Sequence, residues 1–178
     1  MDIKPYIRQA NYYETDQMGI IHHSNYIRWF EEARLDYMKQ TGLSYREMEE
    51  HGIIIPVLSV SCQYRQSVYY GDVVEISLKP VMFTGVKFSF AYEIINQETG
   101  KLCTTGETSH CFLDREKKPI RLKREYPEIY TRFEAAMQKK GKRADAQRSA
   151  QSFFCFSFLL SGASGVQILP FDQGIIIW

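Results

Sequence analysis

A short segment between residues 14 and 26 contains the residue types that acyl-transfer chemistry requires. Asp16 stands in a polar loop, Gly19 ends that loop, and His23 precedes a run with helical spacing. Attack on a thioester carbonyl creates an oxyanion, and unpaired backbone N–H groups at a helix start are preorganised donors for that charge. Asp16 could attack the carbonyl itself or remove a proton from water. The segment therefore indicates an acyl-transfer site.

The same residues also have simpler interpretations. Asp16 can form an Asx-type turn with Thr15 and Gly19, which is a common use of aspartate in loops. His22 and His23 lie beside a helix start, where a neutral histidine is more often packed or hydrogen-bonded than a base. No HxH, HExxH or clustered Cys/His spacing accompanies them, so we expect no metal site.

The helix that follows must position these groups. Ser24 and Asn25 offer N-cap side chains, and Gly42 offers a stop. An aromatic stripe of this kind more often belongs to a core than to a cofactor site, so we expect the helix to lie against a sheet. The residues of the stripe recur at helical spacing: Tyr26, Trp29, Phe30, Ala33, Tyr37 and Met38.

Most of the remaining chain alternates with period two. A tyrosine-rich strand is predicted for residues 6–13 and a short helix for residues 45–50. A strand, a long helix and an antiparallel meander predict an α+β domain, with a sheet of about five strands wrapped around one long central helix. The later strands are predicted at Ile53–Gln66, Val73–Met82, Val86–Ile95 and Lys101–Leu113, with turns at residues 71–72, 84–85 and 98–100.

A change of composition near residue 143 predicts the end of this domain. Residues 124–140 have helical composition, and Gly141 begins a basic, polar exit. We therefore predict a catalytic domain at residues 1–143 and a C-terminal tail of uncertain order at residues 144–178. The tail shows no periodicity that would dock it onto the domain. A functional extension and a non-native translated end both stay open as its origin.

Composition limits the partners and the compartment. The 178 residues are 44% apolar, which is enough to form one hydrophobic core of ordinary size. The 22 basic and 21 acidic residues nearly cancel, so the chain has no net positive electrostatic field that would attract nucleic acid. Four cysteines form no CxxC pair, which favours a reducing cytoplasm. Polar and apolar residues alternate after the start, so we expect no secretory signal. The longest apolar run, residues 153–160, is short of the roughly 18 residues that span a bilayer. We expect a cytoplasmic protein with no membrane span.

Two separated motifs carry a family resemblance. The first is ETDQMGIIHHSNY at residues 14–26, followed by FEEAR at residues 30–34. The second is YYGDVV at residues 69–74. In this order they resemble the signature of the 4-hydroxybenzoyl-CoA thioesterase family, which includes bacterial short-chain and long-chain acyl-CoA thioesterases. The resemblance covers residues 5–140.

The resemblance implies a hotdog fold and an acyl-CoA substrate, with water as the second reactant and no metal or cofactor. It implies that Asp16 is the catalytic carboxylate and that the backbone N–H of His23 polarises the thioester oxygen. It also implies a homodimer or homotetramer with active sites at the subunit boundary. Glu31 and Arg34 match the helix motif, and at i,i+3 spacing we expect a structural ion pair. The residues expected to bind substrate are Gly19, His22, Ser24 and Tyr26.

Two other functions compete with hydrolysis. A hotdog dehydratase or hydratase would use a histidine base and a separate acid, which His23 with Glu31 or Glu32 could imitate. A non-catalytic module could hold acyl-CoA or acyl carrier protein, since the fold supplies a groove whatever the chemistry. The loop from Asp16 to Gly19 before the helix favours the esterase, because a binder needs no carboxylate there. Hydration of crotonyl-CoA would identify the hydratase.

Deletion of residues 144–178 is expected to leave thioester hydrolysis and the melting temperature unchanged. The predicted strands are complete by Leu113 and the closing helix by Lys140, so the core needs no further chain. An exposed apolar run after Ser152 would favour aggregation, so truncation should improve solubility. Melting curves and a panel of acyl-CoA substrates compare the two chains. The alternative is that residues 153–160 fold back over the acyl groove or anchor the enzyme to a membrane surface. A melting temperature lower by several degrees, or a changed chain-length preference, would show that the tail belongs to the working enzyme.

Overall fold

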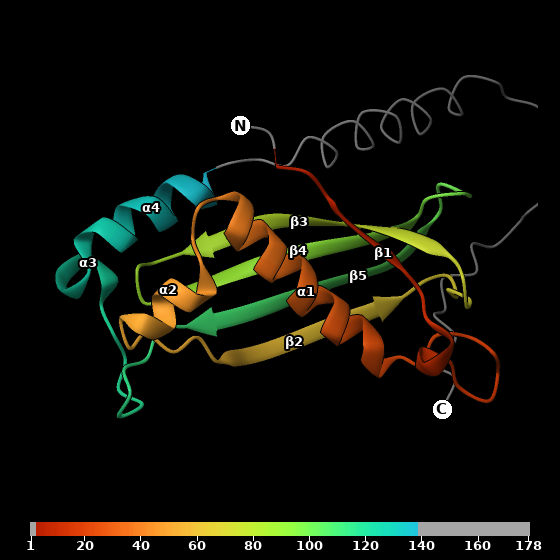
Figure 1. Cartoon of the computed structure of the whole chain (residues 1–178), viewed down its shortest axis with the longest axis horizontal. Helices are drawn as coiled ribbons and strands as arrows, with labels where there is room; N and C mark the ends of the chain where they lie inside the picture. Colours follow the sequence, from red (N-terminus) through yellow and green to blue (C-terminus); the bar gives the residue numbers. More distant parts are fainter. Residues whose placement is uncertain (1–2, 139–178) are drawn as a thin grey trace, which may run out of the picture. The chain divides into compact units, whose positions relative to one another are not determined.

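A single antiparallel sheet organises the described part of the chain. The computed structural model describes residues 3–138, so the predicted tail lies outside the described residues. Five strands pair in the order β1-β3-β4-β5-β2 (Figure 1). Strands are β1 Tyr6–Gln9, β2 Val57–Tyr64, β3 Val73–Phe83, β4 Lys87–Asn96 and β5 Leu102–Cys111; helices are η1 Tyr12–Glu14, α1 Ser24–Gln40, α2 Tyr45–Glu50, α3 Leu122–Glu125 and α4 Pro127–Met137.

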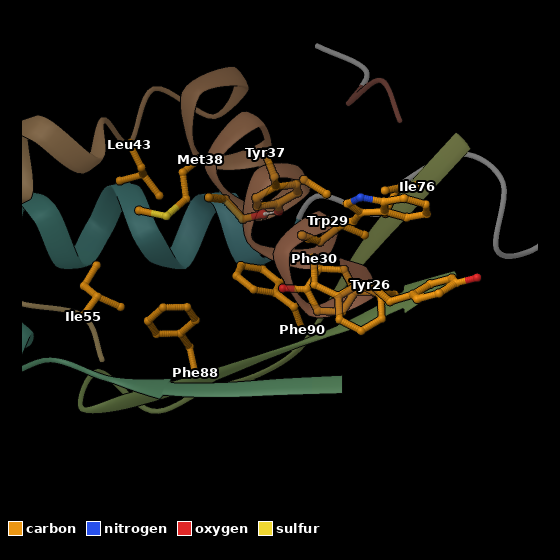
Figure 2. Packing of buried hydrophobic residues seen from close by; sticks show 14 of the residues in the cluster. Tyr26, Trp29, Phe30, Tyr37, Met38, Leu43, Ile55, Ile76, Phe88 and Phe90 are labelled. Atoms are coloured by element: carbon orange, nitrogen blue, oxygen red, sulfur yellow. Dashed lines mark hydrogen bonds between the residues drawn. The ribbon is translucent and has the colours of Figure 1, made fainter. Parts of the chain in front are cut away.

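Helix α1 lies across one face of this sheet and buries its aromatic stripe there (Figures 1 and 2). Phe30 stacks on Tyr92 of β4 with ring centroids 4.4 Å apart, and Tyr37 meets Phe90 edge-on at 5.3 Å. Four alternating side chains of β4 are buried, and the predicted stripe of α1 is buried throughout. The inward residues of β4 are Phe88, Phe90, Tyr92 and Ile94.

The two ends of α1 differ in how well the sequence predicted them. Gly42 adopts a φ of 76° and donates its N–H to the Lys39 carbonyl at 3.1 Å, while Leu43 donates to Met38 at 2.8 Å, which forms a Schellman stop. At the start, the prediction that Ser24 or Asn25 caps the helix is wrong. His23 is the N-cap residue, and no side chain caps it.

Several predicted element boundaries are also wrong, and two of them have clear local causes. The strand predicted to Tyr13 ends at Gln9, because the Asn11 N–H bonds the Glu14 carboxylate at 2.8 Å in a capping box that starts η1. The helix predicted for residues 124–140 is two helices, because Pro127 lacks a backbone N–H and opens a new helix. The first of these changes matters for the site, since η1 leads directly into the Asp16 loop.

The ion pair expected between Glu31 and Arg34 is absent from the described residues. Glu31 is exposed, whereas Arg34 is 4% exposed and faces the sheet. Burial, with the nearby charge of Arg34, lowers the pKa of His110 to about 4, so this histidine is neutral near pH 7. The imidazole Nε2 of His110 and the hydroxyl of Tyr92 each lie 2.9 Å from the hydroxyl of Thr108. Arg34 therefore belongs to a polar cluster inside the core.

Gly106→Ala is expected to destabilise the protein. A Cβ atom at Gly106 would lie 2.5 Å from the Phe30 ring and 2.7 Å from the Ser61 carbonyl, so either α1 or β2 must shift. Overpacking of this kind lowers the free energy of unfolding by about 1–3 kcal/mol, which urea denaturation measures. Thr105→Ala, on the opposite face of β5, is the control. A Gly106→Ala variant within about 0.5 kcal/mol of the parent would contradict this close packing.

Candidate active site

The loop between η1 and α1 holds Asp16 in a closed turn. The backbone N–H of Asp16 donates to the Ile20 carbonyl at 2.9 Å, and Gly19, at a φ of 73°, donates to the Asp16 carbonyl at 3.0 Å. The Oδ1 atom of Asp16 accepts the Met18 N–H at 2.8 Å, so the Asx turn considered from the sequence is formed. The Oδ2 atom has no hydrogen-bond partner among residues 3–138. One carboxylate oxygen therefore shapes the loop, and the other is open to a substrate or water.

The start of α1 presents an N–H group next to this loop. His22 donates its N–H to the Glu14 carbonyl at 2.8 Å, and Asn25 donates to the His22 carbonyl at 3.0 Å. Ser24 N–H points to the His22 Nδ1 atom at 3.3 Å. Within the described part of the chain, the N–H of His23 has no acceptor. An N–H at this position carries the positive end of the helix dipole and can bind a developing oxyanion.

The rings of His22 and His23 pack against each other, and within residues 3–138 neither ring bonds a carboxylate. Their centroids are 4.0 Å apart, and the His22 Nδ1 atom lies 2.8 Å from the Ser24 hydroxyl. Since Nδ1 also accepts the Ser24 N–H, the proton of a neutral His22 ring lies on Nε2. The predicted residues His22, His23 and Ser24 thus form one group at the helix start.

Tyr64, at the end of β2, is a residue of this region that the sequence did not indicate. Its hydroxyl donates to the His23 carbonyl at 3.0 Å, although it lies 41 positions later in the chain. The ring of Tyr64 also meets Tyr26 edge-on at 5.2 Å, and Tyr26 lies 4.9 Å from Trp29 (Figure 2). Tyr26, predicted to bind substrate, is buried in the core beneath the helix start. Burial raises the pKa of Tyr26, so its hydroxyl stays neutral.

Glu14 is the second residue that the sequence did not single out. This carboxylate is 3% exposed and accepts the Trp29 indole N–H at 2.9 Å and the Asn11 N–H at 2.8 Å. It forms an ion pair with Arg8, which also pairs with Glu32 and lies 5.1 Å above the Trp29 ring. The spacing of Asn11 and Glu14 matches a capping box, which is the signal that could have identified η1.

Other features of residues 3–138 bear on metals and membranes. This part of the chain has no group of three His, Cys, Asp or Glu side chains placed to hold a metal ion. Cys62, Cys103 and Cys111 are free thiols, and Cys155 lies outside the described residues. In the same range, no helix is long and apolar enough to cross a bilayer.

Comparison with known proteins assigns the family. The model of the thioesterase-like superfamily matches residues 11–154. The chain belongs to this superfamily. Bacillus subtilis YneP is 33% identical over 129 residues, which cover 72% of this chain and 93% of YneP. The crystal structure of a DHNA-CoA thioesterase from Staphylococcus aureus is 40% identical, with a TM-score of 0.69, and the match covers 74% of this chain and 91% of that one.

A third relative is named by its reaction. The acyl-CoA thioester hydrolase YbgC of Escherichia coli O6:H1 is 25% identical over 88 residues, 49% of this chain and 66% of YbgC. These matches confirm that the chain has the hotdog-type thioesterase fold and is a thioester hydrolase. The match is to the superfamily, so the narrower assignment to the 4-hydroxybenzoyl-CoA family stays a prediction.

Proposed function

We propose that this enzyme hydrolyses acyl-CoA thioesters to a free acid and CoA. Asp16 serves as general base or nucleophile, and the His23 backbone N–H is the oxyanion donor. Two observations carry the proposal: one carboxylate oxygen of Asp16 and, seven positions later at the start of α1, the N–H of His23 both lack a hydrogen-bond partner among residues 3–138. Gly19, His22 and Ser24, which belong to the same loop and helix start, are assigned to substrate binding.

The reaction follows from this arrangement. The thioester carbonyl oxygen accepts the His23 N–H, which makes its carbon more electrophilic. As general base, Asp16 removes a proton from water, the resulting hydroxide attacks the carbonyl carbon, and the tetrahedral intermediate expels the CoA thiolate. The protonated Asp16 then gives its proton to the thiolate, which returns the carboxylate to its starting state. As nucleophile, Asp16 would attack the carbon directly, expel the thiolate and form a mixed anhydride that water hydrolyses.

The relatives support CoA esters as the substrate class. The Staphylococcus aureus structure is that of a DHNA-CoA thioesterase, and a relative from Thermosynechococcus vestitus is named 1,4-dihydroxy-2-naphthoyl-CoA hydrolase. The latter is 25% identical over 122 residues, 66% of this chain and 83% of the relative. Aromatic acyl-CoA esters therefore belong in the first substrate panel beside aliphatic ones.

The two competing functions fit the geometry less well. A hydratase needs an acid beside a histidine base, but Glu32 is bound to Arg8 and to the Tyr6 hydroxyl, and Glu31 is an exposed residue of α1. A binding module has no use for the open carboxylate oxygen of Asp16. Hydrolysis is the function that uses both the Asp16 carboxylate and the His23 N–H at the start of α1.

Asp16→Asn is expected to lower turnover by a factor on the order of 100 or more, while acyl-CoA binding stays near the parent value. The amide keeps the shape and the Met18 hydrogen bond but cannot accept a proton or attack. Stopped-flow release of free thiol measures the chemical step. Asp36→Asn makes the same substitution at a side chain that bonds Gln40 on α1 and should keep parent turnover. The assignment is wrong if Asp16→Asn keeps more than about a third of parent turnover when chemistry limits the rate.

Assembly into a homodimer or homotetramer is also part of the proposal. Strand β2 is an edge strand, so one row of its backbone groups lacks a partner strand within the sheet. Apolar side chains Val57, Leu58 and Val60 of this strand are 52%, 49% and 37% exposed. Pairing of two β2 edges would cover this surface symmetrically. Because Tyr64 of β2 contacts His23, such an interface would lie next to the Asp16 loop.

Light scattering at micromolar concentration should therefore report two or four chains. Val60→Lys places a charge on the β2 surface and should favour the monomer and lower turnover together. Val81→Lys is the matched control, because Val81 is an exposed residue of β3, 55% accessible, away from the β2 edge. A parent protein that is monomeric and fully active would contradict the assembly.

A further inference from the structure

We infer that Glu14 is a positioning residue for thioester hydrolysis, because it determines where the His23 N–H lies. The inference rests on the proposed function of the site. Glu14 is in neither the predicted catalytic set nor the predicted substrate-binding set. It contacts the groups on both sides of His23 without contacting the reacting atoms.

The backbone carbonyl of Glu14 holds the start of α1. It accepts the N–H of His22 at 2.8 Å and the side-chain amide of Asn25 at 2.9 Å. These donors lie before and after His23 in the chain. A displacement of the Glu14 carbonyl therefore moves the peptide that carries the oxyanion donor.

The carboxylate of Glu14 in turn holds its own backbone in place. Three donors from three parts of the fold bind it: Arg8 of β1, the Asn11 N–H before η1 and the Trp29 indole N–H of α1. The carboxylate is 3% exposed and the Trp29 side chain is fully buried. A buried carboxylate bound in this way cannot change its position without breaking a charge pair. The oxyanion donor is thereby tied to the core and to β1.

Arg8 provides the means to separate positioning from general stability. Its guanidinium pairs with Glu14 and with Glu32, and Glu32 otherwise bonds the Tyr6 hydroxyl of β1. Within residues 3–138, the hydrogen bonds and the ion pair of the Glu32 side chain join it to Arg8 and Tyr6 and to no residue of the loop or of positions 22–25. Glu32→Gln is thus a matched control, since it removes a carboxylate from the same arginine and leaves the His23 peptide in place.

The test measures kcat, KM and melting temperature for Glu14→Gln, Glu32→Gln, Asn25→Ala and Asp16→Asn, well below each melting temperature. Glu14→Gln should lower kcat by about tenfold or more and change KM by less than about threefold, because a misplaced donor affects the transition state most. Glu32→Gln should keep kcat within about twofold of the parent. Asn25→Ala, which removes one link and keeps the buried carboxylate, should lower kcat in the same direction.

A spectroscopic readout accompanies the kinetics. The chain has two tryptophans, so the indole ¹H–¹⁵N spectrum is simple. The Trp29 indole signal should move in Glu14→Gln and stay in place in Glu32→Gln, because the Trp29 N–H bonds Glu14.

Parent kcat in folded Glu14→Gln overturns the inference, as does an equal loss in Glu14→Gln and Glu32→Gln. If Glu14→Gln does not fold, Asn25→Ala decides, and parent kcat in that variant overturns the inference. If Asp16→Asn is inactive and Glu14→Gln is fully active, the positioning role of Glu14 is refuted and the proposed function of the site is not. A fully active Asp16→Asn refutes the proposed function itself.

Discussion

The buried charge pair of Glu14 and Arg8 is the interaction on which the geometry of the site depends. A carboxylate that is 3% exposed must be paired and hydrogen-bonded, and here Arg8, Trp29 and the Asn11 N–H do this. Removal of one partner of such a pair costs about 3–5 kcal/mol, because the other charge stays buried. Burial of Glu14 therefore requires β1, η1 and α1 to stay together, and the Asp16 loop is the segment that connects η1 to α1.

The aromatic core and the site are connected through α1. Its buried face packs on β4, and the Schellman stop at Gly42 ends it cleanly, so the helix has little freedom to slide. Tyr64 adds a bond from β2 to the His23 carbonyl. A rigid helix held at this carbonyl presents its first N–H groups at a fixed place, and preorganisation of that kind is what oxyanion stabilisation requires. The Asp16 carboxylate is positioned by the hydrogen bonds of its own turn.

Local patterns in the sequence predicted the elements well, whereas side-chain pairing was predicted poorly. Period-two alternation predicted β4, and the aromatic stripe predicted α1. The Asp16 loop was predictable from the sequence because its residues are consecutive. Glu14 was missed because glutamate is usually exposed, and its burial depends on Arg8 and Trp29 together. Tyr64 reaches His23 only through the register of β2 with β5, which no local pattern specifies. A cytoplasmic location and the separate tail stay predictions.

Infrared spectroscopy tests most directly whether the start of α1 polarises the thioester carbonyl. A ketone analogue of an acyl-CoA, with a methylene group in place of sulfur and ¹³C in the carbonyl, cannot be hydrolysed. The carbonyl stretch of this analogue bound to the enzyme is compared with the stretch in water. If the His23 N–H donates to the carbonyl in a site preorganised by the fold, the bound frequency is lower than in water. A bound frequency equal to or higher than the value in water would contradict an oxyanion-donor role for the His23 N–H.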